Sequence, residues 1–123
     1  SFEQLALIET LGIGAHAVQR AALNPGEKIL LIGAGPIGLS VLEFAQIAGV
    51  DVILLERSSK RRAFCEANYR LFGVIGAVDQ AEQHLRQILD GDLPTAVFDA
   101  TYNAQSMKNG ENSQNIPAVA VTE

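Results

Sequence analysis

The 123-residue chain has the length of one ordinary domain, and 48% of its residues are hydrophobic, so it can bury a core without disulfide support. Its formal net charge of −5 offers no electrostatic surface for nucleic acid or an anionic membrane. One cysteine, Cys65, excludes an internal disulfide and a cysteine-rich metal site, and it favours a reducing cytoplasm. No apolar stretch reaches the roughly 18 residues of a membrane span. Because Ser1 opens the chain without methionine or a signal peptide, we expect a cytoplasmic fragment or processed chain.

Residues 1–24 form a predicted leading helix, because apolar residues recur on one face at helical spacing. Gly12 and Gly14 each cost such a helix about 1 kcal/mol relative to alanine. The two glycines therefore predict a neighbour that packs closely against this turn. A turn follows at "NPGEK" from Asn24.

Strands and helices then alternate through residues 28–101. The expected strands are "KILLIG" from Lys28, "VDVILLE" from Val50, "VIGAVD" from Val74 and "TAVFDAT" from Thr95. The expected helices are "PIGLSVLEFAQIAG", stopping at Gly49; "RSSKRRAFCEANYRLFG", capped by Ser58 or Ser59 and stopping at Gly73; and "AEQHLRQILD". This alternation predicts an α/β fold with a doubly wound parallel sheet. Residues 102–123 read as an irregular tail in which "AVAVT" forms at most a short fifth strand.

A glycine motif, Gly33-Ala34-Gly35-Pro36-Ile37-Gly38, joins the first strand to the next helix. In dinucleotide-binding folds the first glycine allows the tight turn, the second lets the backbone approach a pyrophosphate, and the third lets helix and strand pack closely. The helix start offers unpaired N–H groups and a positive dipole end to phosphate. The motif alone is weak, but its place between strand and helix predicts dinucleotide binding.

An acidic residue, Glu56, ends the second strand at the distance expected of a ribose-binding carboxylate. It favours NAD, because a 2′-phosphate roughly 4 Å away would be repelled by about 1 to 4 kcal/mol. The adjacent Arg57 leaves NADP as the less favoured cofactor, since arginine attracts phosphate. The alternative interpretation is that Arg57 is solvated and its side chain lies across the face of the adenine.

From Leu5 to Thr101 the chain resembles the cofactor domain of zinc-type medium-chain alcohol dehydrogenases, closest to the polyol, threonine and sugar-acid branch. The resemblance lies in the helix from Glu9 to Ala17, the "PGEKILLIGAGPIG" block, and "DAT" at residues 99–101. It implies a Rossmann-type fold whose sheet is incomplete at the C-terminal edge. It also implies cofactor contacts from Gly33, Gly35, Pro36, Ile37, Gly38, Glu56, Arg61, Ala100 and Thr101. Arg57 joins these candidates through its position after the second strand.

The resemblance also implies that Glu9 is a zinc ligand in the parent enzyme; the alternative is a solvated or helix-capping glutamate. His16 lies about 10 Å further along the helix axis, so both side chains cannot bind one zinc ion. We expect His16 to pack or to line the domain cleft, His84 to be solvated, and Cys65 to fill the core.

The catalytic domain of the family, with its cysteine and histidine zinc ligands, has no counterpart in these 123 residues. The prediction is therefore a single dinucleotide-binding domain over residues 1–123 that binds NAD but does not catalyse alone, with zinc only in the parent. Tyr102 replaces the family's glycine after "DAT". We expect the exposed sheet edge to favour a homo-oligomer. A non-catalytic regulatory module and an S-adenosylmethionine-dependent methyltransferase are the alternatives.

Overall fold

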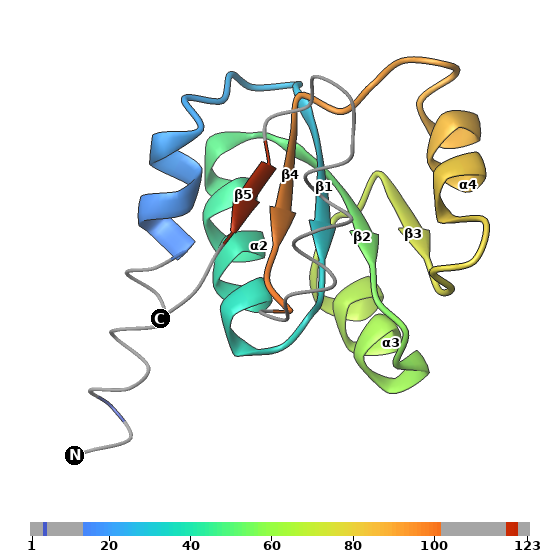
Figure 1. Cartoon of the computed structure of the whole chain (residues 1–123). Helices are drawn as coiled ribbons and strands as arrows, with labels where there is room; N and C mark the ends of the chain where they lie inside the picture. Colours follow the sequence, from blue (N-terminus) through green and yellow to red (C-terminus); the bar gives the residue numbers. More distant parts are fainter. Residues whose placement is uncertain (1–3, 5–13, 102–117, 121–123) are drawn as a thin grey trace.

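Five parallel strands in the order β3-β2-β1-β4-β5 form the centre of the fold. The computed structural model describes residue 4, residues 14–101 and residues 118–120. The strands are β1 (Lys28–Ile32), β2 (Asp51–Leu55), β3 (Gly73–Ile75), β4 (Ala96–Asp99) and β5 (Ala118–Ala120), and the helices are α2 (Pro36–Ala48), α3 (Ser59–Asn68) and α4 (Ala81–Ile88) (Figure 1). The order and the parallel register confirm the predicted α/β, Rossmann-type doubly wound sheet.

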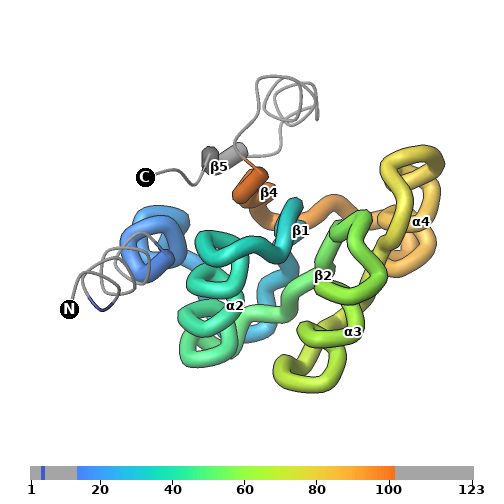
Figure 2. The backbone as a smooth tube through the Cα atoms, turned by 90° about the horizontal axis from the view of Figure 1, so that it is seen from below, coloured from blue at the N-terminus to red at the C-terminus, as the bar shows by residue number. Residues whose placement is uncertain are grey.

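Helices cover both faces of the sheet. Because the side chains on both faces of a strand are then buried, consecutive residues of the strands are apolar. Ile29 and Leu31 of β1 pack into the cluster that contains α2 and Cys65. Leu30 and Ile32 pack on the opposite cluster, together with α4. Figure 2 shows the same division, with α2 and α3 on one side of the sheet and α4 on the other.

The predicted ends of two helices are confirmed. Gly49 ends α2 in the left-handed conformation, with φ of +74°, and its N–H donates to Gln46 O. Ser58 caps α3, and its hydroxyl accepts a hydrogen bond from Arg61 N at 3.3 Å.

The predicted stop of α3 at Gly73 is wrong, because the helix ends at Asn68. Contacts with α2 draw the chain away beforehand: the Tyr69 hydroxyl donates to Glu43 Oε1 at 2.8 Å, and the main chain of Arg70 exchanges two hydrogen bonds with the Gln46 side chain. Gly73 instead begins β3. A Cβ there would lie 3.0 Å from Ile88 Cδ1, so this glycine lets α4 pack against the strand.

The third strand is shorter than expected, since β3 ends at Ile75 rather than near Asp79. The short fifth strand does form, within the tail that was expected to be irregular otherwise, and it pairs with β4.

Residues 14–20 are helical, and residues 1–3 and 5–13 of the expected leading helix lie outside the described residues. A Cβ on Gly14 would lie 2.6 Å from the main-chain carbon of Ser40, so α2 is the close neighbour that this glycine predicts. Gly12 lies outside the described residues. Within the described ranges, no helix has the length and apolar character needed to cross a membrane.

Candidate dinucleotide site

The chain reverses its winding direction at β1, which lies between β2 and β4 in the sheet. In open parallel sheets a crevice forms at this point, outside the carboxyl ends of the strands. The segments that follow β1 and β4 meet here. Ala100 N donates to Ile32 O at 2.9 Å, and Gly33 N donates to Leu55 O at 2.9 Å.

Two of the three motif glycines are required by the protein itself. Gly33 has φ of +98°, and a Cβ on it would lie 2.9 Å from Thr101 Cγ2. A Cβ on Gly38 would contact the carbonyl oxygen of Gly33 and lie 2.9 Å from its carbon. These two glycines therefore hold the β1–α2 turn, the start of α2 and the end of β4 together.

Gly35 differs from both, because nothing in the described chain requires a glycine there. Its φ of −75° and ψ of −171° are open to any residue, and a Cβ on it would meet only Arg61 Nη1, at 3.9 Å. The space above Gly35 is therefore open within the described chain, where the sequence motif predicts a pyrophosphate.

The amino end of α2 faces this space without a side-chain cap. Gly35 is its N-cap, Pro36 is its first residue, and its first turn contains no acidic side chain. The first helical hydrogen bond runs from Leu39 N to Gly35 O. The N–H groups of Ile37 and Gly38 precede it, so helix geometry leaves them no partner within the helix. They and the helix dipole favour an anion.

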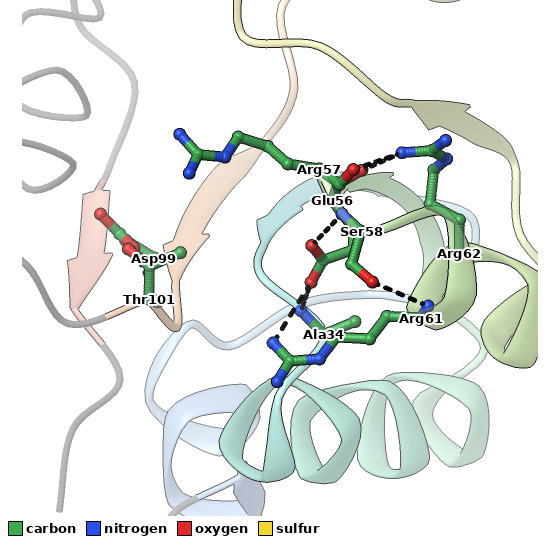
Figure 3. A network of polar contacts seen from close by, with 8 residues as sticks. All are labelled: Ala34, Glu56, Arg57, Ser58, Arg61, Arg62, Asp99 and Thr101. Atoms are coloured by element: carbon green, nitrogen blue, oxygen red, sulfur yellow. Dashed lines mark hydrogen bonds and ion pairs between the residues drawn. The ribbon is translucent and has the colours of Figure 1, made fainter.

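Glu56 is buried, with 8% of its surface exposed, directly after β2. Its Oε1 accepts a hydrogen bond from Ala34 N and its Oε2 accepts one from Ser58 N, both at 2.8 Å (Figure 3). The carboxylate therefore ties the glycine motif to the start of α3. Each oxygen keeps a second lone pair for a ribose hydroxyl, so this position fits the group that the sequence predicts.

Of the two predicted arginines, only Arg61 lies beside this carboxylate. The Arg61 guanidinium is 59% exposed and its Nη1 lies 3.9 Å from Glu56 Oε1. Arg57 is exposed, and Figure 3 shows its side chain extending away from Glu56, in the direction of β4 in this view. Exposed cations of this kind attract phosphate only weakly, because solvent and salt screen them.

Arg62 is a residue of this region that sequence reasoning missed. Its Nη1 donates to Glu56 O at 2.8 Å, to Arg57 O at 2.9 Å and to Gly76 O at 3.5 Å. The sequence signals only a short basic cluster at residues 60–62. Nothing in that pattern distinguishes an arginine that binds carbonyls from one in solvent.

The end of β4 carries a second polar turn. Asp99 is 5% exposed, and its Oδ1 accepts hydrogen bonds from Thr101 N at 3.0 Å and from Thr101 Oγ1 at 2.6 Å. Its Oδ2 has no hydrogen-bond partner among the described residues. Because Thr101 in turn lies against Gly33, Asp99 holds the segment after β4 against the glycine turn.

Within residues 14–101, no three histidine, cysteine or acidic side chains lie close enough together to hold a metal ion. Glu9, the predicted zinc ligand, lies outside the described residues. His16 is exposed, so the expected packing of its side chain is wrong, while its alternative place at a domain cleft stays a prediction. His84 is exposed as expected. Cys65 is fully buried, and this burial raises the pKa of its thiol, which fits the predicted core role.

The chain is similar in sequence to dehydrogenases of sugar acids and polyols, and it spans about a third or less of their length. The chain is 39% identical over 107 residues to L-galactonate-5-dehydrogenase of Escherichia coli, an alignment covering 87% of this chain and 32% of that protein. It is 44% identical over 62 residues to sorbitol dehydrogenase of Bos taurus, covering 50% of this chain and 17% of that protein. No protein-family model matches the chain.

Solved structures agree on the fold. Zinc-dependent alcohol dehydrogenase 2 from Streptococcus pneumonia superposes with a TM-score of 0.79 at 18% identity, over 95% of this chain and 35% of that one. An Escherichia coli oxidoreductase/dehydrogenase of unknown specificity superposes with a TM-score of 0.75 at 27% identity, over 85% of this chain and 30% of that one. The chain thus matches about a third of each of these structures.

Proposed function

We propose that this chain, which is related to the polyol and sugar-acid branch of the zinc-type medium-chain alcohol dehydrogenases, is the part that binds NAD(H). The observation that carries the proposal is the open position at Gly35. Within the described chain, neither backbone conformation nor packing accounts for a glycine there. A pyrophosphate that approaches the main chain does account for it.

The proposed contacts follow from the chemistry of each residue. The Ile37 and Gly38 amides donate to the pyrophosphate, and Pro36 opens the helix without presenting a further N–H. Gly33 shapes the turn. Ala100 and Thr101 flank the nicotinamide half of the cofactor, and their proximity to Gly38 and Gly33 supports this assignment.

Glu56 makes NAD the favoured cofactor over NADP. Its carboxylate is held by two main-chain N–H groups, so it cannot swing away from a bound adenosine ribose without breaking them. A 2′-phosphate roughly 4 Å away would lose about 1 to 4 kcal/mol, or about tenfold to thousandfold in affinity. Arg57 and Arg61 oppose this effect only partly, because both are exposed.

The complete enzyme, in this proposal, transfers hydride between NAD and a secondary alcohol of a polyol or sugar acid. When bound, the nicotinamide supplies the hydride acceptor, and zinc held largely by another part of the enzyme polarises the substrate oxygen. This chain's own share is to bind and orient the dinucleotide. Glu9 remains a proposed zinc ligand, and the 123 residues alone are not expected to catalyse. The free, buried Cys65 supports a cytoplasmic location.

A titration of the purified chain with NADH tests the proposal. We expect the nicotinamide fluorescence to change saturably and ADP-ribose to reverse the change by competition. S-adenosylmethionine should not compete. If neither NADH nor ADP-ribose binds, or if S-adenosylmethionine displaces NADH, the assignment of this crevice is wrong.

A further inference from the structure

Arg62 joins two loops at the carboxyl edge of the sheet. The carbonyls of Glu56 and Arg57 belong to the turn between β2 and α3, and the carbonyl of Gly76 belongs to the loop after β3. The contacts at 2.8 and 2.9 Å are short charge-assisted hydrogen bonds, and the one at 3.5 Å is long. All three contacts are made by Nη1, and a lysine side chain ends one atom short of that position, so its ammonium cannot reach all of these acceptors in the same way.

Gly76 provides the space for this guanidinium. A Cβ on Gly76 would lie 2.9 Å from Arg62 Cζ and 3.0 Å from its Nη1. Gly76 is not among the described glycines with positive φ, so its backbone does not require a glycine. The missing side chain therefore serves the arginine, and an alanine at this position would push the guanidinium off its acceptors.

Every polar atom of Glu56 is engaged in this region. Its N–H donates to Ile75 O at 3.0 Å, its carbonyl accepts from Arg62, and its carboxylate holds the amides of Ala34 and Ser58. Figure 3 shows Arg62 on the far side of the β2–α3 turn from Ala34. Arg62 therefore contacts the main chain of Glu56 from the side of the turn opposite Ala34.

We propose that Arg62 is a positioning residue that, with Gly76, holds the Glu56 carboxylate where it discriminates against a 2′-phosphate. The inference rests on the proposed NAD(H) function. When Arg62 is absent, the carbonyls of Glu56 and Arg57 lose their shared donor, and among the described residues the β2–α3 turn keeps only the Glu56 N–H bond to Ile75 O as its link to the end of β3. The turn is then held less firmly, and the carboxylate can move away from the ribose. Discrimination between NADH and NADPH then falls.

The test compares dissociation constants for NADH and NADPH in the wild-type chain, Arg62→Met, Arg62→Lys, Gly76→Ala and the double variant Arg62→Met/Gly76→Ala. We expect the wild-type chain to prefer NADH by about tenfold or more, and Arg62→Met and Gly76→Ala to lower that preference to about threefold or less. In Arg62→Lys the preference for NADH should lie between those of the wild-type chain and Arg62→Met. Gly76→Ala should have no further effect in the Arg62→Met background, because both changes remove the same contact.

Arg86→Met is the matched control, because Arg86 is exposed on α4 and pairs only with Glu82 among the described residues. The ratio of its dissociation constants for NADPH and NADH should equal that of the wild-type chain. Partial unfolding would weaken both ligands by one common factor and leave the ratio unchanged. A wild-type ratio in Arg62→Met would therefore overturn the inference even if both affinities fell.

A ligand-free measurement separates this inference from the proposed function. In amide hydrogen exchange, the Ser58 N–H should exchange at least about tenfold faster in Arg62→Met, while the Leu31 N–H in β1 stays unchanged. If the wild-type chain binds neither dinucleotide but Ser58 responds in this way, the positioning of Glu56 stands and the NAD assignment fails. If Ser58 does not respond, Arg62 does not position Glu56.

Discussion

Glu56 Oε1 accepts a hydrogen bond from the main-chain N–H of Ala34 at 2.8 Å, across 22 residues of sequence. The side chain that ends β2 thereby fixes the turn that follows β1. A carboxylate expected to face a ribose is also a structural acceptor inside the protein. In the proposed function, ribose binding and protein stability therefore depend on the same two oxygens.

Glu56→Gln should lower stability even without ligand. One of the two amides, from Ala34 or Ser58, would then face the Nε2 donor of glutamine instead of an acceptor. An unsatisfied buried N–H costs about 1–3 kcal/mol, which urea unfolding would detect. Glu66→Gln, an exposed change on α3, is the control and should leave the midpoint unchanged. An equal effect of both substitutions would contradict the structural role.

The three motif glycines should separate binding from stability. Gly35→Ala should change the free energy of unfolding by less than about 1 kcal/mol, because the entropic gain of alanine at a compatible φ is offset by its poorer performance at a helix N-cap. It should nevertheless weaken NADH binding about tenfold or more. Gly33→Ala and Gly38→Ala should both destabilise the fold by about 1–3 kcal/mol. Thermal unfolding and NADH titration of the three variants would show this division. Normal NADH affinity in Gly35→Ala would refute a pyrophosphate at this position.

Asp99 tests how a buried carboxylate holds Thr101. Asp99→Asn keeps the Oδ1 acceptor and removes a buried charge whose second oxygen has no partner among the described residues. We expect its stability to match or exceed the wild-type value, whereas Asp99→Ala should lose about 1–3 kcal/mol. Urea unfolding of both variants decides. If asparagine is as harmful as alanine, the charge of Asp99 itself is stabilising.

Tyr69 predicts a loss of stability at alkaline pH. Burial, and then its hydrogen bond to Glu43, raise the pKa of Tyr69 to about 12. Because this value lies above the unfolded pKa of about 10, the stabilisation is complete below pH 10 and disappears as the pH rises toward 12. An absorbance titration at alkaline pH should show a tyrosine ionisation phase near pH 12 in the wild-type chain and not in Tyr69→Phe. In Glu43→Gln the phase should move to lower pH; if it stays at the same pH, Glu43 contributes nothing to the shift.

Local features account for the part of the fold that the sequence predicts well. Apolar runs between glycine and polar segments predict β1, β2 and β4, and Ser58 and Gly49 predict helix ends, because a cap depends on residues within one turn. The end of α3 could not be predicted in this way. It depends on Tyr69 and Arg70 meeting Glu43 and Gln46 of α2, more than 20 residues earlier in the chain.

The sequence by itself determined the alternation of strands and helices, the glycine turn after β1 and the acidic residue after β2. Each of these features depends only on residues that are close together in the chain. Only the tertiary structure decided which glycines serve the protein and which leaves room for a ligand. It also decided that Glu56 turns onto Ala34 and that Arg62 lies in the space that Gly76 leaves. These outcomes depend on distances between separate loops at one sheet edge, and such distances exist only once the strands have paired.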